Sequence, residues 1–123
     1  MNNMENIKLE NIRKNASLSE KIDRILSEDN IENQYVMCQA IIEYINVKFL
    51  TSRLGKTLPD YNILTIMIEY EKIDEELYDQ ILSINDRYHW LDSTHELDKQ
   101  DIEYLLLKAD YIYGYILKNY MQK

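Results

Sequence analysis

Residues 98–121 read DKQDIEYLLLKADYIYGYILKNYM, and their pattern decides the predicted fold. Apolar residues recur there at intervals of three, four and seven, which is the spacing of a buried helix face. Asp98 can cap the first free amides of this helix, and Lys118 carries the charge that is favoured near a helix C-terminus. The buried face of the predicted helix consists of Ile102, Leu105, Leu106, Ala109, Ile112, Tyr113, Ile116 and Tyr120.

A second apolar line runs along the same stretch. At about 100° per residue, Tyr104, Tyr111 and Tyr115 align about a third of a turn from the centre of the buried face. Leu107 lies close to that line. A helix with two apolar faces can bury one in its own core and offer the other to a partner. We therefore predict a partner interface at these four residues, with an intramolecular groove against the N-terminal segment as the alternative.

The composition favours a few long helices. The chain has 123 residues, enough for one domain with a single core, and 46% of them are hydrophobic. It contains 2 glycines and 1 proline, far fewer than a sheet protein needs for its tight turns. We predict an all-α, up-and-down bundle of four to five helices over residues 17–123, preceded by an N-terminal arm or frayed helix over residues 1–16.

Local signals place the other helices of this bundle. Ser17 and Glu20 have the spacing of a capping box, which predicts a helix from about residue 18 to 28. Residues 31–54 have the pattern of one long central helix that is apolar on more than one side.

A further helical region is predicted to start near Tyr61. Asp74, which two glutamates follow, has the character of a fresh helix start, because acidic residues are favoured at the positive end of the helix dipole. The region is therefore either one kinked helix or two helices with a short break.

Charge and residue supply exclude several classes of function. The 14 basic and 22 acidic residues give a net charge of −8, which opposes nonspecific attraction to nucleic acid or to an anionic membrane, and no DNA partner is expected. No stretch approaches the roughly 18 apolar residues of a membrane span, and no signal peptide is visible. The single cysteine, Cys38, fits a reducing compartment, so we expect a cytoplasmic protein. The two histidines are not adjacent, and the sequence has no glycine-rich phosphate-binding loop. We therefore predict that the protein holds neither a metal ion nor a cofactor.

One cluster of residues has the chemistry of a binding or catalytic site. Arg87, Tyr88, His89 and Trp90 are consecutive, and His95 follows shortly after. Arginine can hold a phosphate, histidine can move a proton near neutral pH, and tryptophan or tyrosine can stack on a base. The alternative is an ordinary helix end in which Trp90 packs into the core and the polar groups face water.

The order of these features resembles the HEPN family of small helical-bundle proteins. The resemblance extends over residues 31–118 and depends on order and spacing rather than on any single motif. Its pieces are QAIIEY at residues 39–44, LPD at 58–60, LTIM at 64–67, DEEL at 74–77, LSINDRY at 82–88, and the spacing Ala109-x-x-Ile112-x-x-Tyr115-Ile116.

The resemblance implies either a nuclease or a partner-binding protein. Active HEPN proteins are metal-independent ribonucleases that use an arginine and a following histidine, usually across a dimer. Other members pair with a nucleotidyltransferase, as toxin or antitoxin, or bind nucleotides. Arg87 stands where the family arginine is expected, but His89 is too close to it and His95 is one residue too far.

We therefore expect a HEPN-like binding module with a degenerate nuclease site, and not an active enzyme, in a toxin–antitoxin or defence system. The expected partners are a second copy of the chain and a nucleotidyltransferase or antitoxin protein, and RNA or a nucleotide is a further candidate ligand. Two alternatives stay open. One is a metal-independent endoribonuclease that uses Arg87 and His95, and the other is an acidic helical regulator that binds a basic protein.

Overall fold

The computed structural model describes residues 7–54 and 74–120, and for residues 50–54 it describes the backbone alone. Within these ranges the chain forms helices and no strand, so the predicted all-α class is confirmed. A short 3-10 helix precedes the α-helices. The elements are η2 (Ile12–Lys14), α1 (Ala16–Ser27), α2 (Ile31–Leu54), α4 (Glu75–Thr94) and α5 (Lys99–Asn119).

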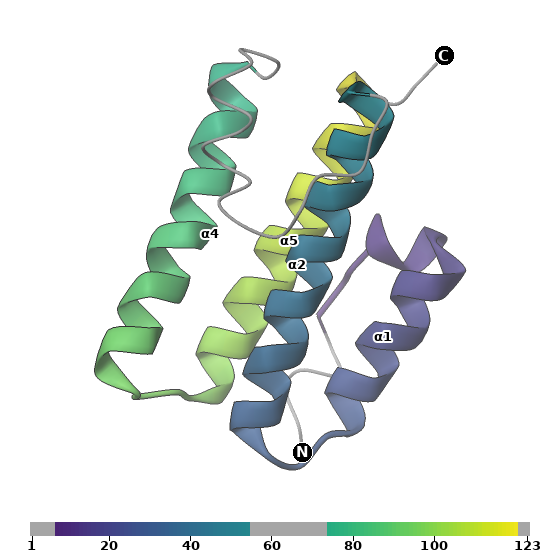
Figure 1. Ribbon diagram of the computed structural model, residues 1–123. Coiled ribbons are helices and arrows are strands. Elements are labelled where there is room, and N and C mark those ends of the chain that lie inside the picture. The colour runs from purple at the N-terminus through teal and green to yellow at the C-terminus, as the bar shows by residue number, and fades with distance from the viewer. Residues whose placement is uncertain (1–6, 55–73, 121–123) are drawn as a thin grey trace.

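The helices lie side by side along one direction (Figure 1). α5 packs against both α2 and α4, and α1 packs against the other side of α2. Short connections join α1 to α2 and α4 to α5 at the same end of the bundle. The predicted region that begins near Tyr61 lies outside the described residues. α5 is therefore the helix that joins the two sides of the described bundle.

The helix starts follow capping chemistry, with one difference from the prediction. Asp74 accepts a hydrogen bond from the Leu77 N–H at 2.9 Å and so caps α4, at the place where a fresh helix start was predicted. Asp98 and Asp101 each accept from the other's backbone N–H, at 3.1 and 3.0 Å, and close a capping box on α5. These bonds satisfy amides that the first helical turn leaves free.

The capping box predicted at Ser17 and Glu20 is wrong. Asn15 caps α1, because its backbone is extended and its side-chain oxygen accepts from the Leu18 N–H at 3.1 Å. The helix therefore begins at Ala16, ahead of the predicted start.

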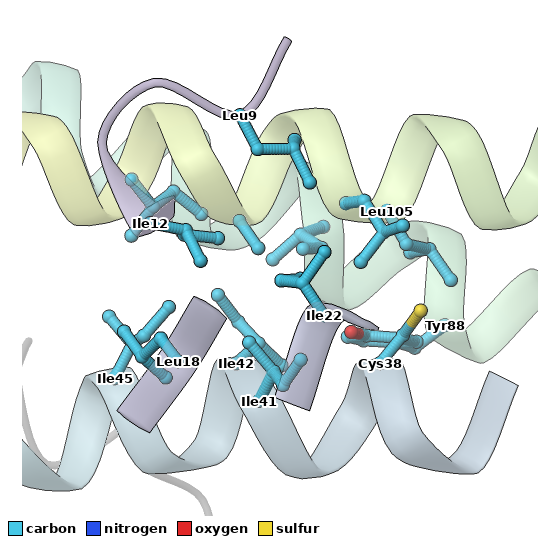
Figure 2. Packing of buried hydrophobic residues seen from close by; sticks show 14 of the residues in the cluster. Leu9, Ile12, Leu18, Ile22, Cys38, Ile41, Ile42, Ile45, Tyr88 and Leu105 are labelled. Carbon is cyan, nitrogen blue, oxygen red and sulfur yellow. The ribbon is translucent and has the colours of Figure 1, made fainter. Parts of the chain in front are cut away.

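The core is a single apolar cluster between these helices. Figure 2 shows Ile22, Ile41 and Ile42 among the buried side chains that converge towards α5. On the predicted inner face of α5, Tyr113 and Tyr120 are partly buried and the other side chains are fully buried. The fully buried residues of that face are Ile102, Leu105, Leu106, Ala109, Ile112 and Ile116.

The segment before α1 also enters this core. Leu9 and Ile12 are 3% and 0% exposed, and they pack in the same cluster as the helices (Figure 2). Asn11 lies against Gly114 of α5, so close that a Cβ atom at that glycine would meet the Asn11 Nδ2 atom at 2.3 Å. Gly114 therefore makes room for the N-terminal segment inside a helix, a position that otherwise favours alanine.

Candidate functional site

Arg87 lies between two aromatic rings where α4 faces α5. Its Cζ atom is 4.8 Å from the ring centroid of Tyr104 and 5.6 Å from that of Trp90. Its Nη1 atom is 3.9 Å from the Asp101 Oδ1 atom. Cations are attracted to the faces of aromatic rings within about 6 Å. The guanidinium is therefore held by two rings and a carboxylate of its own chain.

These residues line an open hollow on the surface. The hollow has a volume of about 480 Å³ and is bordered by Ser83, Asp86, Arg87, Trp90 and Tyr104. Trp90 is 49% exposed, so the alternative in which it fills the core is wrong. The sequence assigned Arg87 and Trp90 to one site and Tyr104 to another, and the structure brings them together.

The two histidines lie apart from the guanidinium. His89 is exposed on α4, and His95 ends that helix in the left-handed region, with φ of 57°. His95 lies eight positions after Arg87 in the sequence, which corresponds to about 12 Å along a helix axis. No hydrogen bond or ion pair of the described residues joins Arg87 to either histidine. The site therefore has the guanidinium of Arg87 and two aromatic rings, but neither histidine makes a hydrogen bond or ion pair with that guanidinium.

Tyr88, the remaining residue of the predicted cluster, faces inward. It is 8% exposed, and its ring meets the ring of Tyr35 edge-on, with the centroids 5.8 Å apart. Its hydroxyl has no hydrogen-bond partner within the described part of the chain. Burial, with Cys38 nearby, raises the pKa of this hydroxyl far above its ordinary value. Tyr88 therefore contributes to the core and not to the hollow.

A polar contact that no sequence pattern indicates joins α2 to the end of α4. The Tyr35 hydroxyl donates to Asp92 Oδ1 at 2.5 Å and accepts from the Gln39 side-chain amide at 3.2 Å. Burial first, and then the hydrogen bond and charge of Asp92, raise the pKa of Tyr35. Tyr35 and Asp92 are 57 positions apart, and no local pattern marks them as a pair.

The predicted interface residues of α5 lie on its outer side, next to α4. Leu107 and Tyr111 are 41% and 46% exposed, whereas Tyr104 and Tyr115 are partly buried. The Tyr111 and Tyr115 rings stack, with centroids 6.3 Å apart and an angle of 26° between planes. Together with Trp90 of α4, these four residues form a surface that we call the aromatic seam.

Contacts with α4 hold both ends of the aromatic seam. Arg87 covers Tyr104 at one end, and the Tyr115 hydroxyl donates to Asp74 Oδ2 at 2.7 Å at the other. This hydrogen bond, more than burial, raises the pKa of Tyr115 to about 12. The seam residues between these two anchors are left to face solvent.

Asp74 binds the two C-terminal tyrosines of α5. Its carboxylate accepts from Leu77 and Tyr115, and its backbone N–H donates to the Tyr120 hydroxyl at 2.7 Å. Burial acts to raise the pKa of Asp74, but the hydrogen bonds from Leu77, Tyr115 and Tyr120 outweigh it and hold the pKa below its ordinary value. The start of α4 is thereby fixed to the end of α5.

Residues 7–54 and 74–120 contain neither a cluster of metal ligands nor a helix that could span a membrane. No three or more His, Cys, Asp or Glu side chains converge there as a metal site would require. None of the helices in those ranges has the length and apolar character needed to cross a membrane. No protein-family model, curated protein or solved structure matches the chain.

Proposed function

We propose that this protein is a HEPN-like helical binding module with a degenerate nuclease site, and that its aromatic seam docks a basic partner protein. The observation that carries the proposal is the exposure of Trp90, Leu107 and Tyr111 on one face whose ends are held in place. Exposed aromatic residues on a rigid face bind at a low cost in side-chain entropy. A toxin–antitoxin or defence system is the setting that the resemblance suggests.

Charge supports a basic partner. Asp74, Glu75, Glu76, Asp79 and Asp86 are exposed on α4, the helix that borders the seam. The seam's own cations are already engaged, since Arg87 is paired with Asp101 and the Lys108 ammonium donates to Gln80 at 2.7 Å.

The seam also offers surfaces that bind cations. Arg87 and Lys108 both lie over the Tyr104 ring, at 4.8 and 5.7 Å from its centroid. The more exposed rings of Trp90 and Tyr111 can accept cations from outside in the same way. An arginine-rich surface therefore fits this face, and acidic side chains would also steer it there.

The same contacts argue against phosphate chemistry at Arg87. Asp101 Oδ1 lies 3.9 Å from the Arg87 Nη1 atom, so the negative charge of this carboxylate would repel a phosphate that approached the same guanidinium. Asp86, which borders the same hollow, adds negative charge beside the site.

A titration with a short arginine-rich peptide tests the proposal, because the emission of the single tryptophan, Trp90, reports on the seam directly. We expect a saturable change in emission at low salt. The affinity for the peptide should fall at least severalfold between low and physiological salt. The double substitution Leu107→Ala and Tyr111→Ala should weaken binding about tenfold. Val36→Ala is the matched control, since Val36 is 59% exposed on α2 and outside the seam.

Three results would count against this function. The first is an emission that the peptide leaves unchanged at low salt, and the second is equal binding by the double variant and the wild type. The third is a dimeric mass in light scattering that the double variant reduces to a monomer. That result would make a second copy of the chain the occupant of the seam.

A metal-independent endoribonuclease that uses Arg87 and His95 is the second candidate. The side chain of Arg87 is 40% exposed beside the exposed Trp90 ring, which is the observation that favours it. Incubation with diverse RNAs in the presence of a chelator tests this function. The binding proposal expects intact RNA, whereas cleavage that disappears in His95→Ala would establish the nuclease.

A further inference from the structure

A second cavity lies away from the aromatic seam, where the start of α1 meets α2 and α5. It has a volume of about 200 Å³, smaller than the sites that hold drug-sized ligands. Its lining combines apolar side chains with a lysine, a tyrosine hydroxyl and an amide. The lining residues are Asn15, Tyr44, Ile45, Lys48, Tyr113 and Ile116.

Two ammonium groups gather around the tyrosine ring in this lining. The Lys48 Nζ atom is 5.5 Å from the Tyr44 centroid, and the Lys21 Nζ atom, which comes from α1, is 5.6 Å from it. Neither lysine has an ion pair or hydrogen bond to any described residue. Lys21 and Lys48 therefore form a local positive site in a chain whose net charge is −8, and no carboxylate of the described residues forms an ion pair with either of them.

The hydroxyl of Tyr113 is oriented by Asn15. The Asn15 Nδ2 atom donates to it at 3.0 Å, while the Asn15 oxygen is held by the cap on the Leu18 N–H. The Tyr113 hydroxyl thus uses a lone pair for Asn15, and its proton has no acceptor among the described residues. A hydroxyl in this state can donate to a ligand.

The floor of the cavity is apolar. Ile45 and Ile116 are each 1% exposed, and Figure 2 shows Ile45 within the buried cluster. An apolar ligand body that covers this floor gains free energy from burial, while its charged group can stay at the rim near Lys48.

From this combination we infer a binding site for a small monocarboxylate with a compact apolar body. Lys48 supplies a cation and Tyr113 a hydroxyl donor, which together match the two oxygens of a carboxylate. A phosphate monoester carries up to two negative charges and three terminal oxygens, whereas the lining itself contains a single cation, Lys48, and the hydroxyl donor of Tyr113, so a monocarboxylate is the better match in charge. The small volume restricts the body to about one ring. This site is independent of the proposed function of the aromatic seam.

Titration of the full chain with benzoate, followed by ¹H–¹⁵N NMR, tests the inference. We expect saturable shifts centred on the amides of Asn15, Tyr44, Lys48 and Tyr113, and much weaker effects from benzyl alcohol and phenyl phosphate. Lys48→Met should weaken benzoate binding about tenfold, because it removes a charge-assisted contact and keeps an unbranched side chain that is only one atom shorter.

Tyr113→Phe is the second variant and should weaken binding about threefold, because it removes one neutral donor. Lys99→Gln, at the far end of α5, is the charge control and should bind as the wild type does. The inference is overturned if benzoate produces no saturable shifts, if the shifts centre on Trp90, or if Lys48→Met binds as tightly as Lys99→Gln. Tighter binding of phenyl phosphate than of benzoate would also overturn it.

Discussion

The carboxylate of Asp110 accepts a hydrogen bond at 2.7 Å from the backbone N–H of Ile12, which lies 98 positions earlier in the chain. The same oxygen accepts from the Asn11 N–H at 2.9 Å. A buried acid of α5 therefore satisfies free amides at the start of η2. This contact fixes the N-terminal segment at the point where Ile12 enters the core.

Removal of this carboxylate should loosen the whole bundle. We expect Asp110→Ala to lower the free energy of unfolding by about 3 kcal/mol, because two backbone N–H groups lose a charged acceptor. Urea denaturation followed by circular dichroism measures the change. Asp86→Ala is the control, since that exposed carboxylate accepts no hydrogen bond within the described residues. Similar losses in both variants would show that the contact does not stabilise the fold.

The close approach of Asn11 to Gly114 should appear as a coupling between the two positions. Alanine in a helix is favoured over glycine by about 1 kcal/mol, but a Cβ at residue 114 would lie 2.5 Å from the Asn11 Cγ atom. We expect Gly114→Ala to destabilise the wild type and to stabilise an Asn11→Ala variant.

A double-mutant cycle from urea denaturation measures this coupling, which we expect to be about 1–2 kcal/mol. Equal effects of Gly114→Ala in the two backgrounds would mean that the side chain of Asn11 moves aside without loss. In that case the glycine would not be required by the N-terminal segment.

The lowered pKa of Asp74 makes its contribution to stability depend on pH. The folded pKa lies below the ordinary value of 3.8, so the contribution is complete above about pH 4 and is lost as the pH falls through the folded pKa. We expect the wild type to be more stable than Asp74→Asn at pH 6, with a difference that shrinks towards pH 2. Urea denaturation over this range tests the expectation.

The Tyr115 hydroxyl is one source of that shift, so Tyr115→Phe provides the matched comparison. In the Tyr115→Phe background, the effect of Asp74→Asn on the free energy of unfolding should depend less on pH than it does in the wild type. A difference that stays constant from pH 6 to pH 2 would show that the ionisation of Asp74 is not linked to folding.

The thiol of Cys38 should report on opening of the core. It is 2% exposed, and burial raises its pKa to about 12 from 9.0. Only the thiolate reacts with alkylating agents, so we expect native protein to react at least about a thousandfold more slowly than protein in urea. Mass spectrometry of iodoacetamide-treated samples measures the two rates. Comparable rates would mean that the core around Cys38 opens readily.

Local patterns were sufficient for the helices that are described. The bounds of α2 agree with the predicted 31–54, and Asp98 caps the helix that it was expected to cap. α4 begins directly after Asp74, where a fresh helix start was predicted. Periodicity and capping act over a few residues, so one sequence contains them. The start of α1 was missed because Ser17 also has cap chemistry, and only the extended backbone of Asn15 distinguishes the true cap.

The sequence identified the residues of the candidate site but not which of them contact one another. Arg87, Trp90 and Tyr104 were all predicted to be functional, but nothing local indicates that Tyr104 lies under the guanidinium. Tyr88 is adjacent to Arg87 in sequence yet faces the core, because neighbouring helical residues point about 100° apart. Membership of the HEPN family and the docking role of the seam stay predictions.

The sequence by itself determined where helices form and which faces are apolar, since hydrophobic period and cap chemistry are local properties. The tertiary structure alone decided which distant groups meet: Asp110 with Ile12, Tyr35 with Asp92, and Asp74 with Tyr115. These pairs depend on the order and angles in which the helices pack. Packing arises from the combined burial of the whole core, so no short stretch of the chain specifies them.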